Sequence, residues 1–192
     1  MKKSVLSLVF AVIFGFTTSA ITPIDGEKKV VKPEESVVTW KAYKVTGSHS
    51  GIVNLKEGSL MFDEGKLTGG EFVVDMTTLV STDLEGENKG KLEGHLKSED
   101  FFGIAKHPTS KLIFTSVDSS GKNSYEVTGD LTIKGITKPV TFDVSVYGSK
   151  ATATLKVDRT NYDIKFRSDN FFENLGDKTI YDEFDLVVDL VF

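Results

Sequence analysis

Residues 184–192 read FDLVVDLVF, and the alternation within this stretch decides the fold class. Every second residue from Phe184 to Phe192 is apolar, whereas Asp185 and Asp189 lie between them. Successive side chains of a β-strand point to opposite faces, so this spacing predicts a strand with one dry face and one wet face. The chain is therefore expected to end in a half-buried strand.

The same alternation recurs along most of the chain, and turn signals such as Glu57-Gly58 and Lys134-Gly135 interrupt it. It predicts nine strands, over residues 36–45, 49–56, 58–64, 67–76, 111–118, 123–134, 137–148, 151–158 and 182–192. Short turns make neighbouring strands antiparallel, and about eight strands with one dry face can close into a barrel without exposed edges. Periodicity alone leaves a β-barrel and a β-sandwich open.

Two segments break the alternation. In the first, Leu92 and Leu96 are four residues apart and predict a short helix over residues 87–97, followed by a tight turn through 99–104. In the second, residues 168–178, the apolar residues have the spacing of one helical turn. The sequence shows no internal repeat and no second apolar core, so we expect a single domain over residues 21–192.

The first twenty residues are predicted to be a secretory signal peptide. Met1-Lys2-Lys3 is basic, residues 5–16 form an apolar run, and Thr18-Ser19-Ala20 offers small residues for cleavage after Ala20. The alternative, an uncleaved anchor, is disfavoured because the apolar run is too short to span a bilayer. We therefore expect a periplasmic or secreted protein that begins at Ile21.

Composition excludes several classes of function. The sequence has no cysteine, which removes disulfide scaffolds, thiolate zinc sites, thiol nucleophiles and lipid attachment at an N-terminal cysteine. The net charge of −5 gives no electrostatic basis for general nucleic-acid binding. After residue 20, no stretch is long and apolar enough to cross a bilayer.

Four motifs carry a resemblance to a known family. They are residues 47–51 (GSHSG), 94–102 (GHLKSEDFF), 106–109 (KHPT) and, most specifically, 127–140 (VTGDLTIKGITKPV). In this order and at this spacing they resemble the YceI family over nearly the whole chain, from about Ser36 to Phe192. Two positions depart from the family pattern, because Gly94 stands where an acid is usual and Lys97 where arginine is usual.

The resemblance implies an exported, lipocalin-like protein: an eight-stranded antiparallel β-barrel with a short helix between strands. Some members of the family bind polyisoprenoids, so it also implies an isoprenoid or similar long apolar ligand inside the barrel. An interior of eight strands is just wide enough either to be filled by side chains or to hold one small ligand. The alternative is a secreted stress or interaction protein, whose barrel is filled by its own side chains and which engages a partner through its outer surface.

The search for catalytic or cofactor chemistry is negative. His49, His95 and His107 do not have the spacing of metal ligands on one element, and hydrogen-bonded histidines near the barrel rim are the simpler interpretation. The sequence contains no G-x-S-x-G nucleophile motif, and its acids fall mostly on wet strand positions and in turns. We predict no catalytic residues, metal or cofactor, and an enzyme acting on the bound lipid is the weaker alternative.

Aromatic residues mark the predicted ligand site. Phe101-Phe102 and Phe171-Phe172 lie outside strands, where adjacent rings either plug a barrel end or line its entrance. Arg159 matches an arginine that the family usually shows. Its planar guanidinium would suit the oxygens of a lipid head group, although an ion pair with an acid at the barrel edge is the simpler interpretation. The predicted ligand-binding residues are Trp40, His49, Phe62, Phe72, Val74, Met76, Leu92, His95, Leu96, Phe101, Phe102, Phe114, Phe142, Arg159, Phe171 and Phe172.

The sequence thus favours an exported carrier of a long apolar molecule. It does not identify the lipid or its head group, and it leaves a homodimer open.

Overall fold

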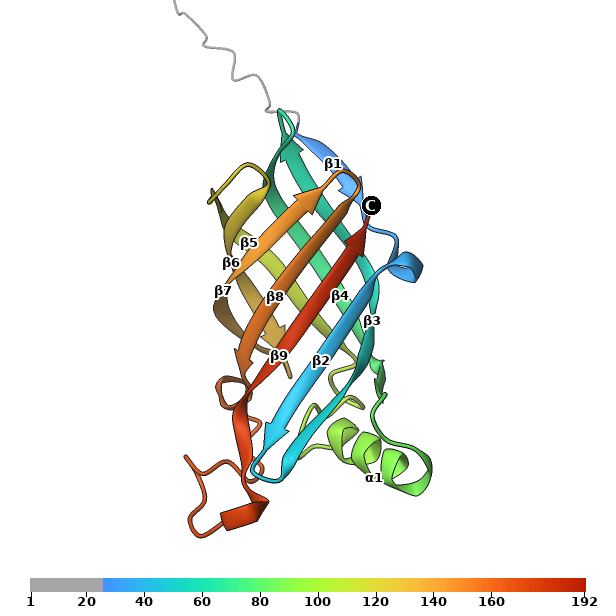
Figure 1. Cartoon of the computed structure of the whole chain (residues 1–192), viewed down its shortest axis with the longest axis vertical. Helices are drawn as coiled ribbons and strands as arrows, with labels where there is room; N and C mark the ends of the chain where they lie inside the picture. The colour runs from blue at the N-terminus through green and yellow to red at the C-terminus, as the bar shows by residue number, and fades with distance from the viewer. Residues whose placement is uncertain (1–25) are drawn as a thin grey trace, which may run out of the picture.

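Nine antiparallel strands form the structure, a computed structural model that describes residues 26–192 (Figure 1). The predicted signal peptide and the expected start at Ile21 lie outside the described residues. The strands are β1 (Glu27–Val30), β2 (Val37–Lys44), β3 (Gly47–Asp63), β4 (Lys66–Ser81), β5 (Thr109–Ser119), β6 (Ser124–Ile133), β7 (Ile136–Tyr147), β8 (Lys150–Asp158) and β9 (Ile180–Val191). The helical elements are α1 (Gly86–Lys97) and the 3-10 turns η1 (Pro33–Glu35), η2 (Arg159–Tyr162) and η3 (Gly176–Lys178).

Strand β3 closes the barrel because it pairs with strands on both of its sides. The sheet runs in the order β2-β9-β8-β7-β6-β5-β4, and β3 joins its two ends by pairing with β2 and β4. The pairing with β2 covers Gly47 to Val53. Farther along, β1 occupies the same side of β3, opposite Ser59 to Phe62. This ring of eight strands confirms the predicted antiparallel barrel and excludes the sandwich.

The predicted turn at Glu57-Gly58 is wrong, because residues 49–56 and 58–64 belong to one continuous strand, β3. The pairing with β4 shifts between Leu55 and Glu57, so an extra residue is absorbed as a bulge and the chain does not reverse. Gly58 serves close packing: a Cβ at this position would lie 2.5 Å from a ring carbon of Phe72. The glycine lets the Phe72 ring lie against the backbone of β3.

The other elements lie close to their predicted positions in the sequence. Helix α1 confirms the helix expected over residues 87–97, and a tight turn follows it, in which Phe101 and Gly103 N–H groups donate to the Ser98 carbonyl. Strand β4 runs five residues beyond its predicted end at Met76, and the short strand β1 was not predicted. The helical turn expected from the apolar residues of 168–178 is absent at Phe171, Phe172 and Leu175, and the 3-10 turn of this segment, η3, follows them at Gly176–Lys178.

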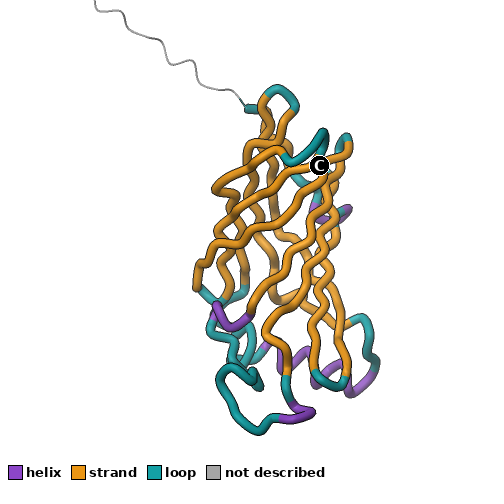
Figure 2. Tube along the Cα trace, turned by 60° about the vertical axis from the view of Figure 1, so that its left-hand side comes forward, coloured by secondary structure: helices purple, strands orange, loops and turns teal. Residues whose placement is uncertain are grey.

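The two ends of the barrel differ. At the upper end of Figure 1, where the chain ends, the Phe62 ring packs against the Phe192 ring with their centroids 5.7 Å apart. At the lower end lie α1 and the connection between β8 and β9, and Figure 2 shows loops and helical turns gathered there. In the part of the chain that the structure describes, no helix is both long and apolar enough to cross a membrane.

Candidate functional site

Two apolar cavities lie inside the barrel, one above the other. The lower cavity, of about 100 Å³, lies near the end with α1, and the upper cavity has about 80 Å³. Both are lined by Val38, Val74 and Leu186, so these three side chains form the partition between them. A chain-like molecule that extended from one cavity into the other would pass these residues.

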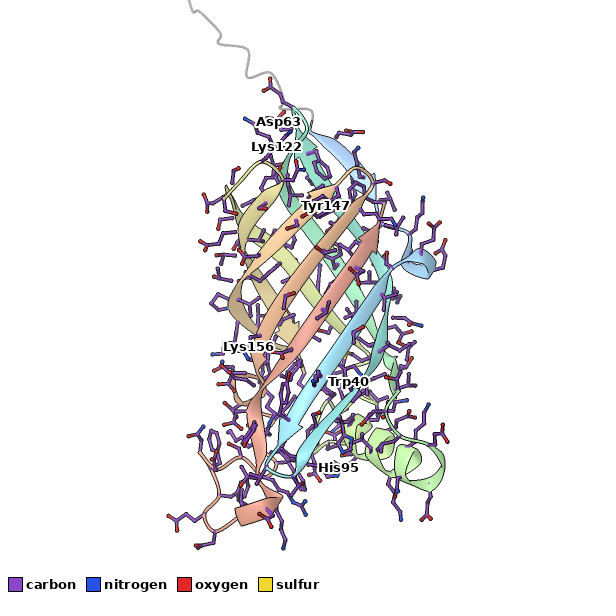
Figure 3. The ribbon with its side chains drawn as sticks, in the orientation of Figure 1. Trp40, Asp63, His95, Lys122, Tyr147 and Lys156 are labelled. Carbon is purple, nitrogen blue, oxygen red and sulfur yellow. The ribbon has the colours of Figure 1, made fainter. Side chains whose placement is uncertain are left out.

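The lower cavity draws its lining from the mouth as well as from the strands. Strands β2, β4 and β9 contribute Trp40, Met76 and Phe184, and α1 with the turn after it contributes Leu96, Phe101 and Phe102. The other lining residues are Val38, Ala42, Val53, Val74, Leu79, Ile133, Arg159, Ile164, Ile180, Tyr181 and Leu186. Figure 3 shows Trp40 in the lower half of the barrel and His95 below it, beside α1.

The upper cavity is lined almost wholly by strand residues of the dry parity. Three of the predicted aromatic residues meet there: the Phe114 ring lies 5.6 Å from the Phe72 ring and 5.7 Å from the Phe142 ring, between centroids. Small residues on β8, Ala151 and Ala153, leave the space that these rings do not fill. The remaining lining residues are Val38, Leu55, Leu60, Val74, Lys111, Leu112, Leu131, Val144, Thr152, Leu155, Leu186, Val188 and Leu190.

Arg159 is tied to the protein itself. Its guanidinium donates to the carbonyls of Tyr181, Ile164 and Ile180 at 3.1, 2.7 and 2.8 Å, and Nη2 lies 3.0 Å from Asp182 Oδ1. The side chain is about 5% exposed, and burial lowers its pKa while Asp182 opposes that shift. An arginine stays charged in proteins, so this is a buried ion pair that ties η2 to β9. The structure thus shows the plainer of the two expected roles.

A groove of about 300 Å³ lies outside the lower cavity. It is lined by Lys44, Thr46, His49, Leu92, His95, Leu96, Phe101, Phe166, Arg167, Asp177, Lys178 and Ile180. Leu96, Phe101 and Ile180 line both this outer groove and the lower cavity, so they separate the barrel interior from the outside. The His95 ring packs edge-on against Phe101 and Phe166, with centroid distances of 4.9 and 4.5 Å.

The second predicted pair of lid residues faces solvent. Phe171 and Phe172 are each 50% exposed and line neither cavity, so of the two aromatic pairs, one of which was expected to close a barrel end, only Phe101-Phe102 lies against the interior. Their backbone N–H groups both donate to the carbonyl of Ser168, a tight turn that directs the pair outward. Ser168 in turn donates to Asp182 at 2.9 Å, which fixes the turn against β9.

His49 and His95 both line the outer groove, whereas His107 does not. His49 Nδ1 lies 2.8 Å from Asp83 Oδ2, and His107 donates its backbone N–H to the Gly103 carbonyl. Burial by itself raises the pKa of Asp83, but hydrogen bonds from His49, Ser81 and the Ser50 N–H lower it to about 2. Within residues 26–192, no group of three or more His, Cys, Asp or Glu side chains could hold a metal ion.

The structure thus sorts the sixteen predicted site residues into five groups. Those on the lower cavity are Trp40, Val74, Met76, Leu96, Phe101, Phe102 and Arg159, and those on the upper cavity are Phe72, Val74, Phe114 and Phe142. His49, Leu92 and His95 lie on the outer groove, with Leu96 and Phe101. Phe62 is buried beyond the upper cavity, against Phe192, and Phe171 and Phe172 are exposed.

Several lining residues were not predicted as part of the site. Phe184, Leu186, Val188 and Leu190 form the dry face of the last strand, and the same alternation that predicts the strand places them inside the barrel. No sequence pattern predicts that Ile164 lines the cavity, because this residue follows η2 in an irregular segment. Among the described lining residues of the two cavities there is no Asp, Glu or His.

These features define an antiparallel β-barrel with an apolar interior that a helix and a turn cover at one end. The model of the YceI-like domain matches residues 30–192, and the chain belongs to this family. The protein YceI of Escherichia coli is 32% identical over 151 residues, which are 77% of this chain and 74% of that protein. A UPF0312 protein of Shewanella denitrificans is 35% identical over 98 residues, so the match spans about half of each protein.

Solved structures show the same fold at lower identity. BcnA of Burkholderia cenocepacia gives a TM-score of 0.62 at 19% identity, over 84% of this chain and 99% of that one. A polyisoprenoid binding domain of Saccharophagus degradans gives 0.56 at 11% identity, over 84% and 95%. The YceI protein of Campylobacter jejuni gives 0.51 at 17% identity, over 98% and 96%. At these identities the likeness concerns the fold.

Proposed function

We propose that this protein binds and carries a long apolar molecule, such as an isoprenoid chain, in its barrel. The observation that carries the proposal is the pair of apolar cavities arranged end to end, with Val38, Val74 and Leu186 between them. The likeness to a polyisoprenoid binding domain supports the same class of ligand. Binding without chemistry is favoured because the described linings of both cavities lack an acid or a histidine.

Hydrophobic burial alone can supply the affinity. Each buried CH₂ group contributes about 0.8 kcal/mol, so a five-carbon isoprene unit contributes about 4 kcal/mol before the cost of ordering the chain. We infer that the chain enters past Leu96 and Phe101 and extends through the lower cavity into the upper one. The closed end at Phe62 and Phe192 then limits the length that fits.

Titration with a homologous series of isoprenoids tests the proposal. We expect affinity to rise with each added unit and to stop rising once the barrel is full. In an Ala153→Phe variant the larger side chain occupies the upper cavity, so affinity should stop rising at a shorter chain, while binding of the shortest ligands is kept. Circular dichroism checks that the variant is folded. Affinity that does not change with length would contradict the proposal.

Export belongs to the same proposal and rests on the order of residues 1–20, a basic start, an apolar run and small residues before Ile21. A carrier outside the cytoplasm would move its ligand across an aqueous compartment. The intact mass of the exported protein tests this directly: we expect a chain that starts at Ile21 and carries no lipid. A mass that retains residues 1–20, or that includes an acyl group, would contradict it.

A further inference from the structure

The connection between β8 and β9 displays two phenylalanine rings to solvent at the lower end of the barrel, beside its mouth. Phe171 and Phe172 are each 50% exposed, whereas every other phenylalanine within residues 26–192 is at least partly buried. Figure 1 shows the connection projecting beyond the strands at the end where α1 also lies. Exposed apolar residues that gather in one place mark a surface that contacts something else.

Hydrogen bonds behind the two rings hold them in this position. The backbone N–H groups of Phe171 and Phe172 donate to the Ser168 carbonyl at 3.1 and 2.9 Å. Ser168 is fully buried, and its hydroxyl donates to Asp182 Oδ2 at 2.9 Å, while the Asn170 amide donates to the same oxygen at 2.7 Å. Asp182 belongs to β9, so the backbone that carries the rings is tied to the barrel wall.

Two more exposed apolar residues lie at the same end. Val45, which is 48% exposed, is at the tip of the hairpin between β2 and β3, and its N–H donates to the Thr179 carbonyl at 3.2 Å. This hydrogen bond joins the hairpin to the connection. Tyr181, near the start of β9, is 50% exposed. We call Val45, Phe171, Phe172 and Tyr181 the apolar rim.

The connection that carries the rings also forms part of the outer groove. Phe166, Arg167 and Lys178 line this groove. Its border with the lower cavity is formed in part by Leu96 and Phe101, which line both. A surface that covered the apolar rim would therefore lie at the entrance to the barrel.

The charges of the connection indicate which kind of surface fits. Residues 165–178 carry three positive and three negative side chains, and so no net charge: Lys165, Arg167, Lys178, Asp169, Glu173 and Asp177. The whole chain has a net charge of −5, which disfavours an anionic membrane. Lys165 Nζ lies 5.0 Å from the centroid of the Phe171 ring, so this lysine can reach a lipid phosphate while the ring enters the head-group region.

From these observations we propose that the apolar rim docks the mouth of the barrel on a zwitterionic lipid surface, with the rings of Phe171 and Phe172 inserted among the head groups. The proposal rests on the proposed function and adds the place where the ligand is exchanged. The ligand then passes between the bilayer and the outer groove without crossing water. A few exposed side chains give only weak, reversible attachment, which lets the loaded protein leave the surface.

The kinetics of transfer to vesicles test the proposal. The protein is loaded with fluorescently labelled geranylgeraniol and mixed with phosphatidylcholine vesicles that contain a quencher lipid. Transfer at a docked surface speeds up with vesicle concentration, whereas transfer through water is limited by release and does not. We expect the wild-type rate to rise with vesicle concentration. The rate of Phe171→Ala, Phe172→Ala should not, and it should be at least about tenfold lower at the highest concentration, which corresponds to about 1.4 kcal/mol.

Two further variants serve as controls, with circular dichroism to check folding. Val30→Ala, Tyr147→Ala removes two exposed apolar side chains, 67% and 58% exposed, from the upper end, where Figure 3 labels Tyr147. It should transfer like the wild type. Phe171→Trp, Phe172→Trp keeps two rings of a kind that prefers the membrane interface, so it should also rise with vesicle concentration. Release in the absence of vesicles should be equal in all of these proteins, because none of the changed residues lines either cavity.

Several results would overturn the docking proposal and leave the proposed function intact. One is a wild-type rate that does not depend on vesicle concentration, and another is a tryptophan pair as slow as the alanine pair. A rate that rises with phosphatidylglycerol content and falls with salt would instead assign the docking to lysines. A wild-type dimer that the alanine pair converts to monomers would assign the rim to a second copy of the chain. If the wild type took up no labelled geranylgeraniol, the proposed function itself would fail.

Discussion

Arg159 illustrates how one residue can hold the mouth of the barrel together through contacts within the protein itself. Substitution by methionine would leave Asp182 Oδ1 and three backbone carbonyls without their partner. Breaking a buried pair from one side costs about 3–5 kcal/mol, and we expect a loss of that size in the free energy of unfolding of Arg159→Met. Urea denaturation measures it.

Arg167→Met is the matched control, because Arg167 is exposed and its guanidinium lies over the Phe166 ring at 5.1 Å. We expect this variant to lose about 1 kcal/mol or less. A stable Arg159→Met protein with weakened ligand binding would reverse our assignment and support a head-group role for Arg159.

Asp83 makes a contribution to stability that depends on pH. Its pKa in the folded protein is about 2, below the ordinary value of 3.8, so its ionised form favours the folded state. The stability it contributes is complete above about pH 4 and is lost as the pH falls toward 2. Because its side chain is 29% exposed and therefore partly screened, we expect Asp83→Asn to cost about 1 kcal/mol at pH 7.

Urea denaturation at pH 7 and at pH 2.5 checks the sign. The difference in the free energy of unfolding between the wild type and Asp83→Asn should be smaller at pH 2.5 than at pH 7. The control Asp118→Asn, at an exposed position near the end of β5, should have the stability of the wild type at both pH values. A difference that stays constant or grows with acidity would show that the hydrogen bonds to His49, Ser81 and Ser50 do not act through the charge of Asp83.

At the scale of elements, we propose that the turn after α1 is the part of the mouth that moves when a ligand enters. Phe101 and Phe102 line the lower cavity, and irregular segments open at a lower free-energy cost than paired strands. We expect a Phe101→Ala, Phe102→Ala double variant to release its ligand at least about tenfold faster than the wild type, because the rings that cover the cavity are gone. Stopped-flow fluorescence of Trp40, the single tryptophan, measures the rate.

The exposed pair provides the control. Phe171→Ala, Phe172→Ala removes the same number of rings from the other irregular segment, where each side chain is half exposed. Its release rate should equal that of the wild type. Equal rates in all three proteins, with the fold intact, would show that Phe101 and Phe102 are fixed parts of the core.

Some elements could be predicted from the sequence and others could not. Alternation predicts which residues of β6 to β9 face inward, because one face of each strand is buried and the other is in solvent. The same alternation did not reveal that residues 47–63 form one strand. Gly58 is a residue type typical of turns, but here it lies within the strand and makes room for the Phe72 ring. The exposure of Phe171 and Phe172 depends on the anchoring of Ser168 by Asp182, a contact that local sequence does not encode.

At the scale of the whole molecule, closure of the barrel is what creates a site. Periodicity shows that each strand has a dry face, but only the pairing of β3 with both β2 and β4 turns these faces into a common interior. The resemblance to the YceI family predicts a closed barrel, and the structure confirms it. The sequence alone does not show whether side chains fill this interior. Filling depends on how small and large side chains face each other, and only the folded barrel brings Ala151 and Ala153 together with the rings of Phe72, Phe114 and Phe142.

The central claim is that the barrel holds a long apolar molecule, and mass spectrometry of an organic extract tests it most directly. Protein purified without detergent should release one class of apolar molecule in an amount close to one per chain. The folded Ala153→Phe variant, whose upper cavity is reduced, should release less of it or a shorter homologue. Folded wild-type protein that yields no such molecule, and that takes none up when isoprenoids are offered, would contradict the account.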